Sequence, residues 1–207
     1  MLFRHAKDAQ LKMGRLVAII VAVGAVIALP SCGGKSEPVK PIGEWTAYNA
    51  EGGDYSMEVP ADWTRTERGG AGGFETTVRA NRSNWVVVKK QILPGGMEAK
   101  LNRSDTREPA IIEAVQGHYG KLESGFEEFR GDAPEVGDAG GAMAGFGSFT
   151  CSKKAGFGGG TVDLMGSTVL IFGLNNVYVF DAFADAESAD VVTAALERML
   201  DTFKFEE

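Results

Sequence analysis

Two long segments near the C-terminus, 162–174 and 177–184, constrain the fold more than any other part of the sequence. Both have the composition and length of strands. They flank Asn175 and Asn176, whose tolerance of positive φ suits a tight turn. The pattern therefore predicts a β-hairpin here, and with it a sheet.

The rest of the domain adds strands and two helices around this hairpin. Trp85 and the three valines after it are apolar at consecutive positions, so their strand should lie near the middle of the sheet. Further strands are predicted at 45–49, 55–60, 75–80, 85–93 and 142–151. Apolar residues at helical spacing predict one helix around Ile111, Ile112, Val115, Tyr119 and Leu122, and a last helix around Val192, Ala195, Met199 and Phe203, capped by Asp185 or Ser188. The acidic segment 126–138 shows no periodicity and is expected to be irregular. These elements indicate an α+β fold with about six or seven mostly antiparallel strands.

The N-terminal segment has the pattern of an export signal. Residues 1–15 are basic, and the apolar run 16–29 is too short to span a bilayer as a helix but has the length of a signal-peptide core. Residues 32–43 are rich in Gly and Pro without periodicity, which is typical of a flexible tether. The sequence thus predicts a signal peptide at 1–31, a tether at 32–43 and one domain at 44–207.

The end of this signal resembles the lipobox of bacterial lipoproteins, with Leu29 three residues before Cys32 and the small Ser31 directly before it. The resemblance implies cleavage before Cys32 and fatty acylation of its thiol, so that the chain is exported and held at a membrane. Gly33 after the cysteine resembles the outer-membrane pattern, which implies the periplasmic side of that membrane in a Gram-negative cell. Two or three acyl chains hold a protein at a membrane where one does not. The alternatives are an ordinary secretory signal that is cut elsewhere and an uncleaved anchor.

The charge of the exported part argues against nucleic acid as a partner. The whole chain of 207 residues has a net charge of −7, and residues 1–31 contribute +3, so the remainder carries −10. A surface this acidic repels phosphate backbones.

Few residues of the exported chain offer catalytic chemistry. His118 lies on or beside the apolar stripe of the first helix, where a lone histidine is more often packed than catalytic, and no Gly-x-Ser-x-Gly motif is present. Cys151 is the one thiol that remains once Cys32 is acylated, and it is expected to be buried and inert. No group of residues has the spacing of a zinc or calcium site, so we expect neither metal nor cofactor.

A candidate contact surface lies near the end of the strand at 142–151. Lys153, Lys154 and Phe157 place positive charge and an aromatic ring in a segment of an otherwise acidic domain. They would suit a membrane or an acidic partner, whereas the alternative is a plain hairpin tip. Trp45, Trp63 and Trp85 are expected to pack in the core, the alternative being that they line a ligand groove.

Three features together resemble the PsbP-like family, whose fold is shared with a nuclear import factor that binds the GTPase Ran. They are the strand that runs from Tyr55 through Pro60 to Trp63, the mid-chain helix followed by an acidic link and a long hairpin, and the last helix that leads into 202–205. The resemblance implies a three-layer α/β/α sandwich around a mostly antiparallel sheet. Members of this family are mostly binding or assembly proteins, and no catalytic motif of the family is carried over to this chain.

The sequence therefore predicts a lipid-anchored envelope protein without enzymatic activity. It would bind a protein partner or support the assembly of a membrane-associated complex. The first alternative is a lipoprotein that binds a small ligand, and the second is an enzyme that uses His118 or Cys151.

Overall fold

A computed structural model describes residues 37–70, 73–154 and 160–205 of the chain. The leader expected at 1–31, Cys32 and Phe157 lie outside the described residues.

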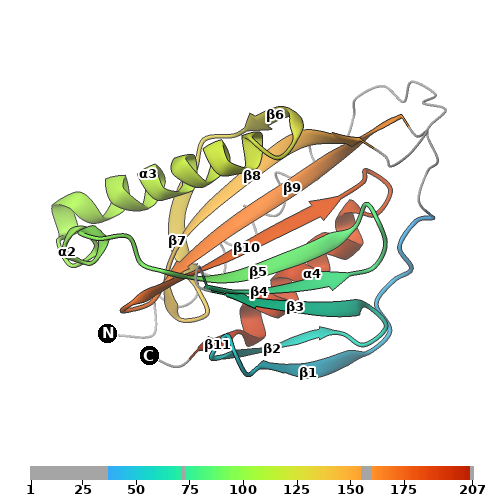
Figure 1. Cartoon of the computed structure of the whole chain (residues 1–207), viewed down its shortest axis with the longest axis horizontal. Coiled ribbons are helices and arrows are strands. Elements are labelled where there is room, and N and C mark those ends of the chain that lie inside the picture. Colours follow the sequence, from blue (N-terminus) through green and yellow to red (C-terminus); the bar gives the residue numbers. More distant parts are fainter. Residues whose placement is uncertain (1–36, 71–72, 155–159, 206–207) are drawn as a thin grey trace, which may run out of the picture.

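The largest element is an antiparallel sheet of eight strands in the order β3-β4-β5-β10-β9-β8-β6, with β7 also paired to β8 (Figure 1). The pairing of β9 with β10 runs from Phe172 opposite Val177 to Met165 opposite Ala184, which confirms the predicted hairpin. β5 lies between β4 and β10, as its consecutive valines predict. The strands are β3 (Thr64–Gly70), β4 (Gly73–Arg79), β5 (Trp85–Ile92), β6 (Glu127–Gly131), β7 (Glu135–Ala139), β8 (Ala142–Lys154), β9 (Thr161–Phe172) and β10 (Asn176–Ala184).

A smaller sheet brings together the beginning and the end of the domain. β1 (Trp45–Ala50) and β2 (Tyr55–Pro60) form an antiparallel hairpin, and β11 (Lys204–Phe205) pairs with the other edge of β2. The segment after the last helix thus ends as a short strand on β2.

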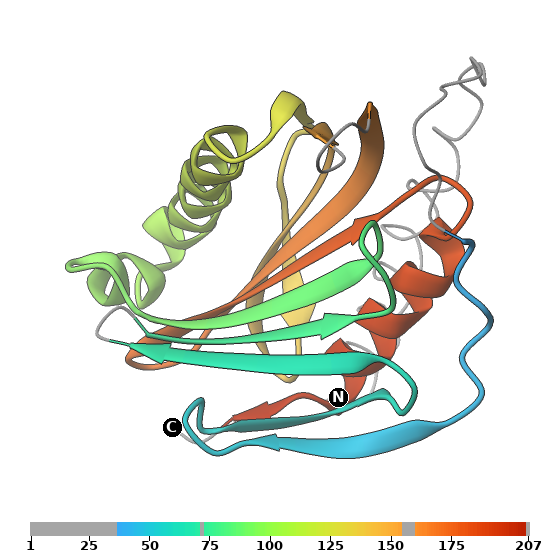
Figure 2. The ribbon, with the colours of Figure 1, turned by 45° about the vertical axis from the view of Figure 1, so that its right-hand side comes forward.

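Helices cover both faces of the large sheet. α3 (Ser104–Glu123), preceded by the short α2 (Met97–Leu101), packs on β6, β7, β8 and β9. α4 (Ala189–Thr202) contacts β10 and β2, so α4 and the small sheet together cover the opposite face (Figure 2). The fold is therefore a three-layer α/β/α arrangement, and the predicted fold class is confirmed.

Each face of the large sheet has its own hydrophobic core. On the α4 side, Met199 and Leu196 of the helix pack with Tyr178 and Phe180 of β10 and with Tyr55 of β2. The core on the α3 side is formed by α3 residues and by the opposite faces of β5, β8, β9 and β10, and includes Ile111, Val115, Tyr119, Phe149, Leu170, Val179 and Phe183.

Two glycines let α3 approach the sheet closely. A Cβ atom at Gly145 would lie 2.6 Å from Val115, and one at Gly147 would lie 2.0 Å from the hydroxyl oxygen of Tyr119. Such contacts are far inside van der Waals distance, so α3 can pack at this depth only because β8 lacks side chains at these positions.

The segment 126–138, expected to be irregular, instead forms β6 and β7, and this part of the prediction is wrong. Both strands add to the edge of β8 through backbone hydrogen bonds, which do not depend on an apolar sequence. Only a few of their side chains, such as Phe129 and Val136, reach the core on the α3 side. The strand signal in the sequence is weak because most of the segment stays exposed.

Candidate functional site

Of the candidate contact residues, Lys153 and Lys154 lie in the last part of β8, and both are exposed. The Nζ atom of Lys154 lies 2.9 Å from a carboxylate oxygen of Glu127 in β6. The hydrogen bond from Lys154 to Glu127 raises the pKa of the lysine, so the lysine remains charged. An exposed ion pair of this kind contributes little to stability, but the carboxylate offsets the charge that Lys154 presents to a partner.

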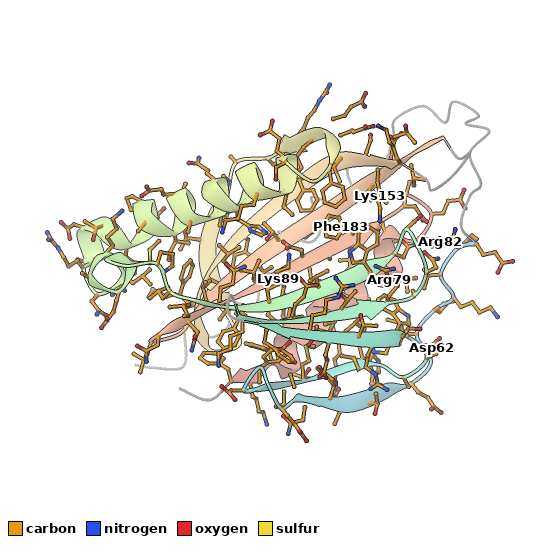
Figure 3. All side chains as sticks on the ribbon, in the orientation of Figure 1. Asp62, Arg79, Arg82, Lys89, Lys153 and Phe183 are labelled. Atoms are coloured by element: carbon orange, nitrogen blue, oxygen red, sulfur yellow. The ribbon has the colours of Figure 1, made fainter. Side chains whose placement is uncertain are left out.

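Lys153 instead lies over an aromatic ring, and a second cation lies over the same ring. The Nζ atom of Lys153 is 4.7 Å from the centroid of the Trp85 ring, and the Cζ atom of Arg79 is 5.7 Å from it. Trp85 is nearly buried and stacks on Phe183, with a centroid distance of 4.6 Å and an interplanar angle of 16°. Figure 3 labels Lys153, Arg79 and Phe183 in this region. A cation over a tryptophan face is attracted by the ring quadrupole, by about 0.5 to 1 kcal/mol at an exposed site.

Lys153 and Trp85 are far apart in the sequence, and the curvature of the sheet brings them together. The pairing of β9 with β10 ends at Met165. Lys153 pairs with Val162 of β9, which lies outside this paired region. This arm of β8 and β9 is therefore free of β10. It curves so that Lys153 reaches Trp85 of β5, although β9 and β10 stand between β8 and β5 in the sheet.

The described chain begins at the same end of the molecule. The side-chain amide of Asn81, in the turn between β4 and β5, donates to the carbonyl oxygen of Glu37 at 3.0 Å. Asn84 of this turn donates to a carboxylate oxygen of Asp185 at 2.8 Å and accepts from its backbone N–H at 3.1 Å. These bonds hold residue 37, the β4–β5 turn and the link before α4 together. Arg82, which is exposed, lies in this turn (Figure 3).

Residues 37–43, expected to belong to the tether, lie along the domain. Val39 and Ile42 pack against the core on the α4 side. The backbone N–H of Val39 donates to the hydroxyl oxygen of Ser188 at 3.1 Å. Ser188 occupies the N-cap position of α4, as predicted, but makes no side-chain capping bond, and its hydroxyl accepts from Val39 instead.

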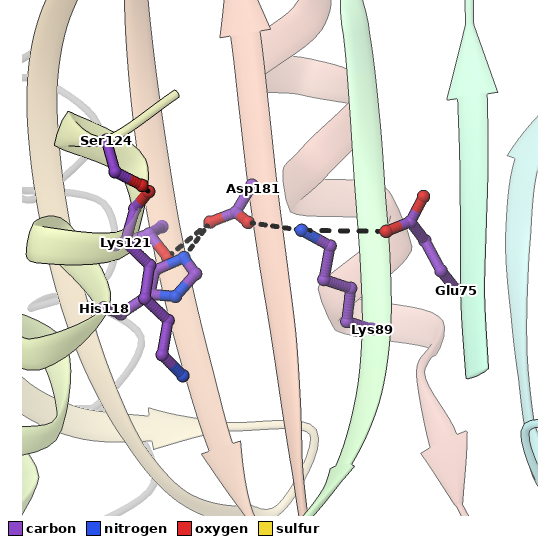
Figure 4. A network of polar contacts seen from close by, with 7 residues as sticks. Glu75, Lys89, His118, Lys121, Ser124 and Asp181 are labelled. Carbon is purple, nitrogen blue, oxygen red and sulfur yellow. Dashed lines mark hydrogen bonds and ion pairs between the residues drawn. The ribbon is translucent and has the colours of Figure 1, made fainter. Parts of the chain in front are cut away.

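His118 is part of a buried polar network that joins α3 to the sheet (Figure 4). Its Nε2 atom lies 2.7 Å from Oδ1 of Asp181 in β10, and the hydroxyl of Thr168 donates to the same oxygen at 2.8 Å. Lys89 of β5 lies 3.9 Å from Oδ2 of Asp181 and 3.7 Å from Glu75 of β4. The side chains of His118 and Asp181 are 6% and 1% exposed, whereas that of Lys89 is 31% exposed.

The polar contacts of His118 are made to other side chains of the domain. His118 is closed off from solvent, and one of its ring nitrogens is occupied by Asp181. The nearby Ser124 donates its hydroxyl hydrogen to the carbonyl oxygen of Lys121. Sequence reasoning placed His118 near the core but missed Asp181. The available signal was a carboxylate within β10, where the flanking residues are otherwise apolar.

Cys151 is buried in the core on the α3 side and forms no disulfide. Burial raises the pKa of its thiol to about 11, so the thiolate is scarce near neutral pH and the residue is a poor nucleophile. The structure thus confirms that this cysteine is buried.

The three tryptophans do not converge on one groove. Trp63 belongs to the core on the α4 side, and Trp45 packs against the same core. Trp85 belongs to the core on the opposite face of the sheet. Their positions match the expected core packing and leave no shared surface for a ligand.

Two further features are missing from residues 37–70, 73–154 and 160–205. No helix in these ranges is both long and apolar enough to cross a membrane. In the same ranges, His, Cys, Asp and Glu side chains form no group of three or more that is arranged to hold a metal ion.

Comparison with known proteins supports the fold. No protein-family model and no curated protein sequence matches the chain. The solution structure of cyanobacterial PsbP (CyanoP) from Synechocystis is similar with a TM-score of 0.51 and 15% identity, over 86% of this chain and 99% of that one. LpqN, described as involved in cell envelope biogenesis of Mycobacterium tuberculosis, gives a TM-score of 0.45 and 14% identity, over 79% of this chain and 91% of that one. The first likeness establishes a PsbP-like fold and nothing about function, and the second is too distant to bear on function.

Proposed function

We propose that this chain is a lipid-anchored envelope protein without enzymatic activity, which binds a protein partner or supports the assembly of a membrane-associated complex. The signal at 1–31 and Cys32 support export and acylation. The observation that carries the proposal is the position of Glu37, which lies close in sequence to Cys32.

Residue 37 is bonded to the β4–β5 turn at one end of the molecule. Only four residues lie between Cys32 and Glu37, and the five steps from one to the other span at most about 18 Å when fully extended. An acyl chain on Cys32 would therefore keep this end of the domain close to the membrane. The opposite end, with the β9–β10 turn and α2, would point away from it (Figure 1).

The state of the two candidate catalytic residues favours binding over catalysis. His118 is buried and paired with Asp181, and Cys151 is buried with a raised thiol pKa. Neither side chain is presented to a substrate, so an enzyme that uses either would first have to open the α3 side of the core.

The anchor is tested by intact-mass spectrometry of the protein purified from membranes of its own host. We expect a chain that begins at Cys32 and carries the mass of two or three acyl groups. The Cys32→Ala variant should retain the uncleaved leader, because the signal would no longer be processed before residue 32. A mature chain that begins elsewhere, or an unmodified Cys32, would contradict the proposal.

The partner is sought with photo-crosslinking amino acids in the anchored protein. The membrane-distal end exposes two large apolar side chains, Ile92 at 76% and Leu174 at 59%. We expect a crosslinker at either position to give one adduct of constant mass in amounts comparable to the protein itself. Asn102, exposed on the helix side of the same end, serves as the control position. Absence of a stoichiometric adduct at all exposed positions tested would count against a binding or assembly role.

A further inference from the structure

We propose that Arg79, Arg82 and Lys153 form a cationic surface that binds the anionic headgroups of the membrane to which Cys32 attaches the chain. This inference rests on the proposed function, because it assumes the anchor. It adds what the anchored end of the domain contacts and how the domain is oriented.

The three cations are exposed and lie at one end of the molecule. Arg79 ends β4, Arg82 follows in the β4–β5 turn, and Lys153 reaches the same region from the curved arm of β8 and β9. Among the ion pairs between described residues, none involves Arg79, Arg82 or Lys153. Their charges are therefore available to an external anion.

Arg79 and Lys153 are held close together over one ring. Since both lie over Trp85, the two charges are at most about 10 Å apart, a distance at which like charges still repel at a protein surface. An anion placed beside the ring would interact favourably with both cations at once. Because Trp85 is fixed by stacking on Phe183, the pair is preorganised and loses little side-chain freedom on binding.

Of two neighbouring carboxylates, one is paired with a lysine and the other accepts hydrogen bonds from neutral donors. Glu127 is engaged by Lys154, which makes that pair neutral. Asp185 accepts from the side chain of Asn84 and from the backbone N–H of Ser188. The exposed Glu37 and Asp62 also lie at this end (Figure 3), so the favourable interaction with an anion is local to the cations beside Trp85.

The charge of the whole exported chain makes the orientation specific. With a net charge of −10, most of the surface is repelled by an anionic bilayer. The end that carries the three cations is the end where the chain emerges toward Cys32, within about 18 Å of the acyl groups. The bilayer is therefore the anionic surface nearest to this end. Attraction of the three cations and repulsion of the rest of the acidic surface both favour an orientation with this end on the membrane.

The test measures how fast Lys153 is acetylated by a water-soluble, membrane-impermeant reagent. The mature protein is inserted into preformed vesicles of phosphatidylcholine alone, or of phosphatidylcholine mixed with phosphatidylglycerol. Lys100, next to α3 at the far end, is the reference. We expect acetylation of Lys153 to be about fivefold slower with phosphatidylglycerol, with no change at Lys100. The difference should disappear in about 1 M salt, where charges are screened within about 3 Å.

Two variants separate the surface from the anchor. In R79Q/R82Q, the protection of Lys153 by phosphatidylglycerol should be lost, whereas Arg103→Gln/Lys204→Gln removes the same charge elsewhere and should preserve it. Arg82→Gln alone should reduce the protection and touches no packed ring, which covers the case that the double variant is unstable.

Equal acetylation of Lys153 in the two kinds of vesicle would overturn the inference, as would full protection in R79Q/R82Q. Protection that needs an added envelope-protein fraction and not phosphatidylglycerol would also overturn it, in favour of an acidic protein partner. The intact mass of the same sample reports the state of Cys32. An unmodified Cys32 contradicts the proposed function and this inference with it, whereas an unprotected Lys153 in acylated protein contradicts the inference alone.

Discussion

Replacing Asp181 with alanine is the sharpest test of the assignment of the His118 network as structural. Asp181 is 1% exposed, and its Oδ1 atom accepts hydrogen bonds from Thr168 at 2.8 Å and from His118 at 2.7 Å. Without the carboxylate, both donors would be left buried and unpaired, and Lys89 would lose its closest contact with β10. Leaving a buried donor without its partner costs about 1 to 3 kcal/mol for each group, so the two donors together cost about 2 to 6 kcal/mol. We therefore expect Asp181→Ala to lower the free energy of unfolding by about this amount.

Two further variants each remove a smaller part of the same network and should lower the free energy of unfolding by less. Thr168→Val keeps the shape of the side chain and removes one hydrogen bond to a charged acceptor, which should cost about 1.5 to 3 kcal/mol. Lys89→Gln should cost less than about 1 kcal/mol, because Lys89 is partly exposed and 3.9 Å from Asp181.

The assay is urea unfolding of the purified protein, followed by tryptophan fluorescence, with equal m-values as the condition for comparing free energies. A loss below about 1 kcal/mol in Asp181→Ala would refute the structural assignment. So would normal stability combined with loss of the crosslinked partner, since this would place Asp181 in a functional site.

Three other substitutions follow from the same structure. The thiol of Cys151 has a pKa near 9.0 in the unfolded state and about 11 in the folded state. Between these values the folded state binds the proton more tightly, so the stability that the thiol contributes is complete below pH 9 and is lost as the pH rises toward 11. Cys151→Ala should make the pH dependence of the unfolding free energy shallower over this window, and equal slopes in both proteins would contradict the raised pKa. Gly147→Ala should destabilise the protein by about 1 to 3 kcal/mol, because the added Cβ displaces Tyr119, and a neutral result in urea unfolding would disprove the close packing of α3. Thr76→Val should cost about 1 to 3 kcal/mol, since its buried hydroxyl oxygen accepts from Tyr55, and thermal unfolding at the same stability as the wild type would exclude that bond.

The elements that the sequence predicts correctly are those specified by local patterns. Asn175 and Asn176 mark the turn of the β9–β10 hairpin, and the spacing of Val192, Ala195 and Met199 marks the buried face of α4. The consecutive valines after Trp85 predict an inner strand because such a strand is covered on both faces.

The features that the sequence does not predict depend on distant parts of the chain. β6 and β7 form because the edge of β8 offers unpaired backbone groups, and their own side chains carry little of that information. Asp181 lies 63 residues from His118, and only the packing of α3 on the sheet brings the two together.

The grouping of Arg79, Arg82 and Lys153 at one end also depends on contacts between distant parts of the chain. Lys153 was singled out as a candidate contact, but Arg79 was not. Arg79 lies opposite Trp85 in the β4–β5 pairing, whereas Lys153 reaches the same ring only through the curvature of the β8–β9 arm. The role expected for Lys154 is weakened by its pairing with Glu127, a contact across strands β8 and β6. Phe157 lies outside the described residues, and its role as a contact stays a prediction.

The central claim, that the anchored domain rests on the membrane with the end that carries Arg79, Arg82 and Lys153, is tested most directly by fluorescence quenching. A fluorophore is attached through Thr161→Cys, at the start of β9, or Asn175→Cys, in the turn after its end, and the strand between them is about 35 Å long. Cys151 is buried and should not react. In vesicles that contain nitroxide-labelled headgroups, the account predicts strong quenching at residue 161 and little at residue 175. Equal quenching at both positions, or stronger quenching at residue 175, would contradict it.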